Sequence, residues 1–117
     1  MSRSLKHVYL ILACINNCAL TPTAVTTSNG RVRVSIIEGM GTNGCKIITL
    51  TCAWERQTVE CVTADILAQT STGSVIVSTD RPTSTSSTAE LKCAADGTFI
   101  SNGFSGLSQF YCDFDCF

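Results

Sequence analysis

Cysteine is the residue type in this chain whose number and spacing point to chemistry. The 117 residues include eight cysteines and a single histidine. Cysteine at this density indicates disulfides formed in an oxidising compartment or metal–thiolate sites in a reducing one. Eight cysteines allow on the order of a hundred pairing patterns, so spacing alone does not give the connectivity. The favoured prediction is a set of disulfides among Cys14, Cys18, Cys45, Cys52, Cys61, Cys93, Cys112 and Cys116.

Metal binding is the alternative use of these residues. Cys14 and Cys18 are separated by three residues, as are Cys112 and Cys116, and two such pairs can form a four-thiolate zinc site. Four further cysteines would then have no role, so disulfides are favoured. The C-terminal pair Asp113 and Asp115 provides too few oxygen ligands for calcium. We therefore expect no metal and no cofactor.

The sequence also argues against catalysis and against nucleic-acid binding. The histidine, His7, lies in a leader segment, so the mature chain lacks the commonest general base. No Gly-x-Ser-x-Gly motif and no phosphate-binding loop is present. A formal net charge of −1 gives no basic field for nucleic acid. We expect a protein that is not an enzyme.

The N-terminus has the outline of a secretory signal peptide. Arg3 and Lys6 precede an apolar run over residues 8–15, which is too short to span a bilayer. Cleavage after Ala13 would leave one cysteine-rich domain over residues 14–117, whereas cleavage after Ala19 would remove two cysteines. The alternatives are a first strand or helix of a cytosolic domain and a lipoprotein lipidated at Cys14. The favoured prediction is a secreted protein with no membrane span in the mature chain.

Strands are the elements expected to position the cysteines. Over residues 44–52, alternation places Ile48, Leu50 and Cys52 on one face. If this segment is extended, Cys45 and Cys52 lie about 23 Å apart, beyond the roughly 7 Å between Cα atoms that a disulfide allows. Each of the two must therefore pair with a more distant part of the chain.

Similar patterns predict further short strands. They fall at residues 31–37, 58–66, 74–79, 89–94, 98–101 and 107–112, the last with Phe110 and Cys112 inward. Turns are expected at Asn29-Gly30, Asp96-Gly97 and Asn102-Gly103, loops at 39–44, 53–57 and 80–88, and a tail at 113–117. This predicts an all-β fold: a small, disulfide-rich, antiparallel β-sandwich-like domain.

Three loop residues suggest ways of binding a partner. Trp54, in a predicted turn, is expected to pack over the sheet edge or to contact a sugar or protein. Arg56 or Arg81 on a rigid loop could imitate a protease substrate, so a secreted protease inhibitor is the alternative function. The Ser/Thr-rich loop at 80–88 is a solvated loop or a site for O-linked sugars.

Several of these segments together resemble the nematode six-cysteine domain, a module regarded as extracellular and of unknown function. The resemblance rests on the Cys14/Cys18 pair, the strand ending at Cys52, and the segments 91–99 and 108–112. It implies three disulfides among Cys14, Cys18, Cys45, Cys52, Cys93 and Cys112. Cys61 and Cys116 are additional, and a fourth bridge between them is possible. A sushi-type complement module is a weaker match, confined to the C-terminal part.

These observations lead to one expected function. We expect a secreted, disulfide-stabilised structural or binding module. Its partner would be an extracellular protein or a glycan, and the sequence does not identify it.

Overall fold

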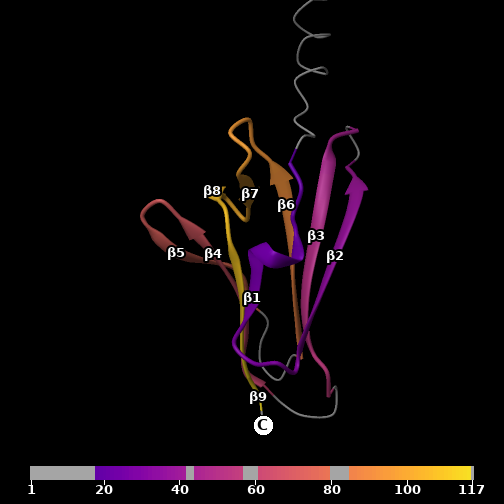
Figure 1. The fold of residues 1–117 in the computed structure, drawn as a ribbon, viewed down its shortest axis with the longest axis vertical. Coiled ribbons are helices and arrows are strands. Elements are labelled where there is room, and N and C mark those ends of the chain that lie inside the picture. Colours follow the sequence, from indigo (N-terminus) through magenta and orange to yellow (C-terminus); the bar gives the residue numbers. More distant parts are fainter. Residues whose placement is uncertain (1–17, 42–43, 57–60, 80–84, 117) are drawn as a thin grey trace, which may run out of the picture.

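Two β-sheets form the fold in the computed structural model, which describes residues 18–41, 44–56, 61–79 and 85–116 (Figure 1). The first sheet has the order β1-β9-β4-β5, and the second has the order β2-β3-β6-β7-β8. Among the described residues, all strand pairs are antiparallel except β1 with β9. The elements are η1 (Pro22–Ala24), β1 (Val25–Thr27), β2 (Val32–Met40), β3 (Lys46–Trp54), β4 (Cys61–Thr70), β5 (Gly73–Thr79), β6 (Ser86–Cys93), β7 (Phe99–Ser101), β8 (Phe104–Leu107) and β9 (Phe110–Cys116). The prediction of a small, disulfide-rich all-β fold is confirmed.

The core lies between the two sheets and follows the alternation of the sequence. On β3, the residues Ile48, Leu50 and Cys52 are fully buried, as predicted. In the other sheet, β4 from Ala64 to Ala68 and β9 from Phe110 to Phe114 also bury every second residue. The rings of Phe99 and Phe110, one from each sheet, meet edge to face with centroids 5.8 Å apart. Burying each large apolar side chain stabilises the fold by roughly 1.5–3 kcal/mol, so this shared layer holds the sheets together.

The strands β2 and β3 run further than the sequence predicted. Their pairing continues without interruption from Val32 opposite Trp54 to Met40 opposite Lys46. The prediction of a loop beginning at Gly39 was therefore wrong. The turn predicted from residue 53 was also wrong at its start, because Trp54 is the last residue of β3 and is only 5% exposed. Nine paired residues outweigh the weak strand preference of one glycine.

The C-terminal segment differs most from the prediction. The single strand expected at 107–112 is divided: β8 ends at Leu107 in the second sheet, and β9 begins at Phe110 in the first. The predicted tail at 113–117 is strand as far as Cys116. The reason is that Phe114 continues the inward alternation of Phe110 and Cys112 and is 4% exposed.

One turn and one loop complete the comparison with the predicted elements. Asn102 and Gly103 have φ of 51° and 81°, as a two-residue hairpin turn requires, and they connect β7 to β8 as predicted. The loop predicted at 80–88 ends earlier, because β6 begins at Ser86. Residues 80–84, the start of the predicted strand at 58–66, and the predicted signal peptide at 1–13 lie outside the described residues. In the described part of the chain, no helix is long and apolar enough to cross a membrane.

Candidate functional site

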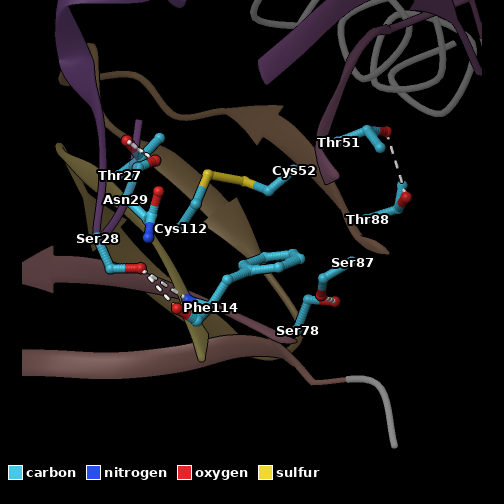
Figure 2. Close-up of a disulfide and its surroundings, with 10 residues drawn as sticks. All are labelled: Thr27, Ser28, Asn29, Thr51, Cys52, Ser78, Ser87, Thr88, Cys112 and Phe114. Carbon is cyan, nitrogen blue, oxygen red and sulfur yellow. Dashed lines mark hydrogen bonds between the residues drawn. A yellow bond between two sulfur atoms is a disulfide. The ribbon is translucent and has the colours of Figure 1, made fainter. Parts of the chain in front are cut away.

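The central disulfide joins the two sheets through the middle of the core. Cys52 on β3 and Cys112 on β9 are both fully buried, with Cα atoms 6.0 Å apart. Figure 2 shows the bridge between the sheets, with the ring of Phe114 beside it. Because 60 residues separate the two cysteines in sequence, this bond links strands that the chain visits far apart.

Two further bridges lie nearer the ends of the sheets. Cys18 bonds to Cys93, which fastens the segment before η1 to the end of β6. Cys61 bonds to Cys116, and the two residues face each other across β4 and β9. The structure thus contains the additional bridge that the sequence allowed. Cys45 is also disulfide-bonded, with its partner outside the described residues, where Cys14 lies too.

Hydroxyl groups complete the contact between the sheets below the central bridge. Ser87 on β6 is fully buried, and its hydroxyl lies 2.7 Å from that of Ser78 on β5 (Figure 2). This bond satisfies hydroxyl groups that would otherwise cost free energy between the sheets. Within the first sheet, Ser28 donates its hydroxyl to the Phe114 carbonyl at 3.0 Å and accepts the Phe114 N–H at 2.9 Å, which fastens the end of β1 to β9.

Of the residues proposed as loop features, the structure describes Trp54 and Arg56, and only Arg56 is exposed. Trp54 is a core residue, so the alternative that it contacts a partner from an exposed turn was wrong. Arg56 is exposed beyond the end of β3, and Arg81 lies outside the described residues. Glu55 forms ion pairs with Arg31 at 3.4 Å and Arg33 at 3.8 Å, which at such exposure contribute little stability.

Acidic side chains do not converge on a metal position either. Asp113 lies opposite Asp65 on the outer face of the first sheet, and Asp115 lies further along β9. Within the described ranges, no cluster of three or more potential metal-ligating side chains is present.

At the turn before β7, the Thr98 hydroxyl and N–H both donate to Asp96, and these bonds hold the pKa of that carboxyl below its usual value.

A groove on the first sheet is a feature of the described surface that can hold a small ligand. Its volume is about 260 Å³, slightly below the roughly 300–1,000 Å³ of typical small-molecule sites. The lining residues come from β1, β4, β5, β9 and the segment before β9; they are Thr26, Leu67, Ala68, Gln69, Ser74, Gln109, Phe110 and Tyr111. We call this the outer groove. None of its lining side chains carries a charge.

Strand register explains how the outer groove is built. Tyr111 lies opposite Thr26 on one side and opposite Leu67 on the other, and Leu67 lies opposite Ile76. These four residues therefore form one row across the outer face, with Tyr111 37% and Ile76 49% exposed. A register shift next to Leu67 interrupts the β4–β5 pairing, and Figure 1 shows this hairpin turning away from the body of the sandwich. The hairpin forms one wall of the groove.

Hydrogen bonds fix the polar rim of the outer groove. The Gln69 N–H donates to the Gln109 carbonyl at 2.8 Å, and the Ser108 N–H donates to the Gln69 carbonyl at 3.1 Å. The Ser74 hydroxyl donates to the Gln69 side-chain oxygen at 3.2 Å. Neither the Tyr111 hydroxyl nor the Gln109 side chain has a hydrogen-bond partner among the described residues. The groove thus combines the hydrogen-bonded side chain of Gln69 with the polar groups of Gln109 and Tyr111 and with the aromatic ring of Tyr111.

Sequence reasoning did not identify the outer groove. The predicted inward positions of Phe110 and Cys112 already implied that Tyr111 points outward. The neighbours of Tyr111 could not be predicted, however. Thr26 and Leu67 lie beside it because β9 pairs in parallel with β1 and antiparallel with β4. Such long-range pairings are not encoded in local alternation.

Comparison with known proteins gives one similarity and no activity. No curated protein and no solved structure matches this chain. The described bridges all start from the central part of the chain, residues 43–99, and end before or after it: Cys93 bonds to Cys18, Cys52 to Cys112, and Cys61 to Cys116. This same central part, residues 43–99, matches a family described as a domain of unknown function (DUF281), and over this range the chain is similar to that family.

Proposed function

We propose that this protein is a secreted, disulfide-stabilised binding module without catalytic activity, and that its outer groove binds a neutral glycan. The observation that carries the extracellular assignment is the fully buried Cys52–Cys112 bond between the sheets. Bonds of this kind form and persist in oxidising compartments and are rare in the cytosol. The similarity to the six-cysteine domain, regarded as extracellular, supports the same conclusion.

The chemistry of the outer groove supports a carbohydrate as the ligand. A sugar ring presents a C–H face that packs on an aromatic ring and hydroxyls that exchange hydrogen bonds with amides. Tyr111 can provide the ring, and Gln69 and Gln109 can provide the amides. Because no lining side chain is charged, the groove favours a neutral sugar over an acidic one. Its volume of about 260 Å³ suits a short segment of a glycan better than a folded protein, which requires a much larger interface.

Glycan-array screening followed by titration calorimetry tests this proposal. We expect at least one neutral glycan to bind, and Tyr111→Ala to weaken binding by about tenfold or more because the ring contact is lost. Phe104→Ala is the matched control, since Phe104 is an aromatic residue of similar exposure, 39% against 37%, on the other sheet. Equal losses in both variants, or no glycan bound at all, would refute the outer groove as a glycan site.

Secretion is tested separately from binding. The full chain, expressed in cells with a secretory pathway, should appear in the medium with every cysteine oxidised. The intact mass before and after reduction and alkylation gives both the leader cleavage site and the number of bridges. Retention of the reduced protein in the cytosol would contradict the extracellular assignment.

Protease inhibition remains the alternative function. Arg56 is exposed just beyond β3, as an arginine that enters a trypsin-like active site must be. Stoichiometric inhibition of such a protease, lost in Arg56→Ala or in Arg81→Ala, would favour this alternative.

A further inference from the structure

Strand β2 is an open edge of the second sheet and carries unusually exposed apolar side chains. It pairs with β3 along one side, and Figure 1 shows it at the margin of the sheet. Val34 is 37% exposed, Ile37 is 62% exposed and Met40 is 70% exposed. Natural edge strands are usually short, charged or covered, because an exposed apolar edge pairs with other strands. β2 has nine residues, its charged residues are Arg33 and Glu38, and no described strand covers its open edge.

The hydrogen bonds at both ends of β2 show which backbone groups face the open edge. The Glu55 N–H donates to the Arg31 carbonyl at 3.0 Å, and the Gly41 N–H donates to the Cys45 carbonyl at 2.8 Å. Odd-numbered residues therefore bond to β3, and even-numbered residues direct their N–H and C=O groups outward. The outward set is Val34, Ile36, Glu38 and Met40. Among the described residues, no backbone partner exists for these groups.

We propose that a second copy of this chain pairs with β2, antiparallel and about a two-fold axis at Ile37. In this register Val34 lies opposite Met40 of the second copy, Ile36 opposite Glu38, and Ile37 opposite Ile37. The three most exposed apolar side chains of the strand thus meet apolar partners. Four residue pairs with two backbone bonds each give about eight hydrogen bonds between the copies.

The choice of register between the two copies follows from comparing a two-fold axis at Ile36 with one at Ile37, the two residues nearest the centre of β2. An axis at Ile36 would place Val34 opposite Glu38 and Ile37 opposite Ser35, so both apolar side chains would face polar ones. The axis at Ile37 gives Val34 and Ile37 apolar partners and leaves the half-buried Ile36 as the apolar residue that faces a charged one, Glu38. It also opposes Ser35 to Gly39, where no neighbouring atom lies within 4 Å of the position that a side chain would take.

The charges on β2 do not oppose this pairing. Glu38 is held by Lys46 at 2.7 Å, and Arg33 lies 3.8 Å from Glu55. With the axis at Ile37, neither charge lies directly opposite a like charge. The paired copies would form one continuous sheet and would leave the outer groove, on the other sheet of each copy, accessible.

Sedimentation velocity over a range of protein concentrations tests the dimer. We expect the full oxidised chain to show a reversible monomer–dimer equilibrium. Ile37→Lys should raise the dissociation constant by about tenfold or more, because like charges would then lie directly opposite each other. Ile76→Lys, on the edge strand of the other sheet with 49% exposure, is the matched control and should leave the equilibrium unchanged.

A charge-swap experiment tests the register itself. Ile37→Glu alone should also fail to dimerise, whereas an equal mixture of Ile37→Lys and Ile37→Glu should recover the dimer through opposite charges across the axis. Near-ultraviolet circular dichroism of each variant shows that the monomer is folded. A monomeric wild-type protein at all concentrations, a dimer lost equally in Ile76→Lys, or a mixture that stays monomeric would overturn the proposal.

Discussion

Removing the central bridge with Cys52→Ala and Cys112→Ala is the perturbation whose effect can be worked out most fully. Both side chains are completely buried, and the Cys61–Cys116 bridge stays in place in the variant. With that bridge closed, the shortest loop that the Cys52–Cys112 bond closes runs through residues 52–61 and 112–116. This loop has roughly 15 residues, for which the chain-entropy model gives about 3 kcal/mol.

The loss of the buried sulfurs adds a second contribution. The void that they leave costs roughly 1 kcal/mol, so the variant should lose about 4 kcal/mol of unfolding free energy. For a chain of this length that loss corresponds to a fall in Tm of about 15 °C. If the Cys61–Cys116 bridge is removed first, the central bond closes a loop at least about twice as long, up to the full separation of 60 residues, and its entropic contribution rises to about 4 kcal/mol.

The two bridges are therefore expected to be coupled. Urea denaturation of the wild type, the two single-bridge variants and the variant lacking both forms a thermodynamic cycle. Loss of both bridges should cost about 1 kcal/mol more than the sum of the separate losses. A loss below about 1 kcal/mol on removing the central bridge, or strict additivity, would refute this reasoning.

Three further perturbations test the core and one turn. Trp54→Ala should lower the unfolding free energy by about 3–5 kcal/mol in urea denaturation, because the ring is a core residue; a change below about 1 kcal/mol would contradict its burial. Ser87→Ala should cost about 1–2 kcal/mol by the same measurement, since the Ser78 hydroxyl loses its partner between the sheets, and an unchanged midpoint would contradict that role. Asp96 has a lowered folded-state pKa, so the stability it contributes is present above the unfolded value of 3.8 and is lost as the pH falls through the folded value. Asp96→Asn should therefore be less stable than the wild type at pH 7 and equally stable at strongly acidic pH, and a difference that persists in acid would contradict the Thr98 hydrogen bonds as its cause.

Local alternation was sufficient to predict most strands but not their ends. The inward residues Ile48, Leu50 and Cys52 follow directly from a period of two, which burial between two sheets enforces. The end of β3 at Trp54 depends on pairing with β2, and that pairing has no local signal. The crossing between sheets before Phe110 was also missed, although the alternation breaks there: Leu107 and Phe110 are both buried, and the two residues between them are exposed.

The candidate site was less predictable than the fold. Tyr111 could be assigned to the outer face from its neighbours, whereas Thr26 and Leu67 reach it through pairings between distant segments. The open edge at β2 was also hidden, because an alternating strand looks the same in the sequence whether it lies in the centre or at the margin of a sheet. Strand order is set by the whole fold, and the bridge between Cys52 and Cys112 is part of what fixes it.

Disulfide mapping of the secreted protein under non-reducing conditions tests the central claim most directly. Cleavage after lysine and arginine isolates Cys52 on residues 47–56, and cleavage before aspartate separates Cys93, Cys112 and Cys116 from one another. We predict that mass spectrometry will find the Cys52 peptide linked to the peptide that ends at Cys112. A free thiol at either residue, or a link from Cys52 to any other cysteine, would contradict a fold in which this bond joins the two sheets.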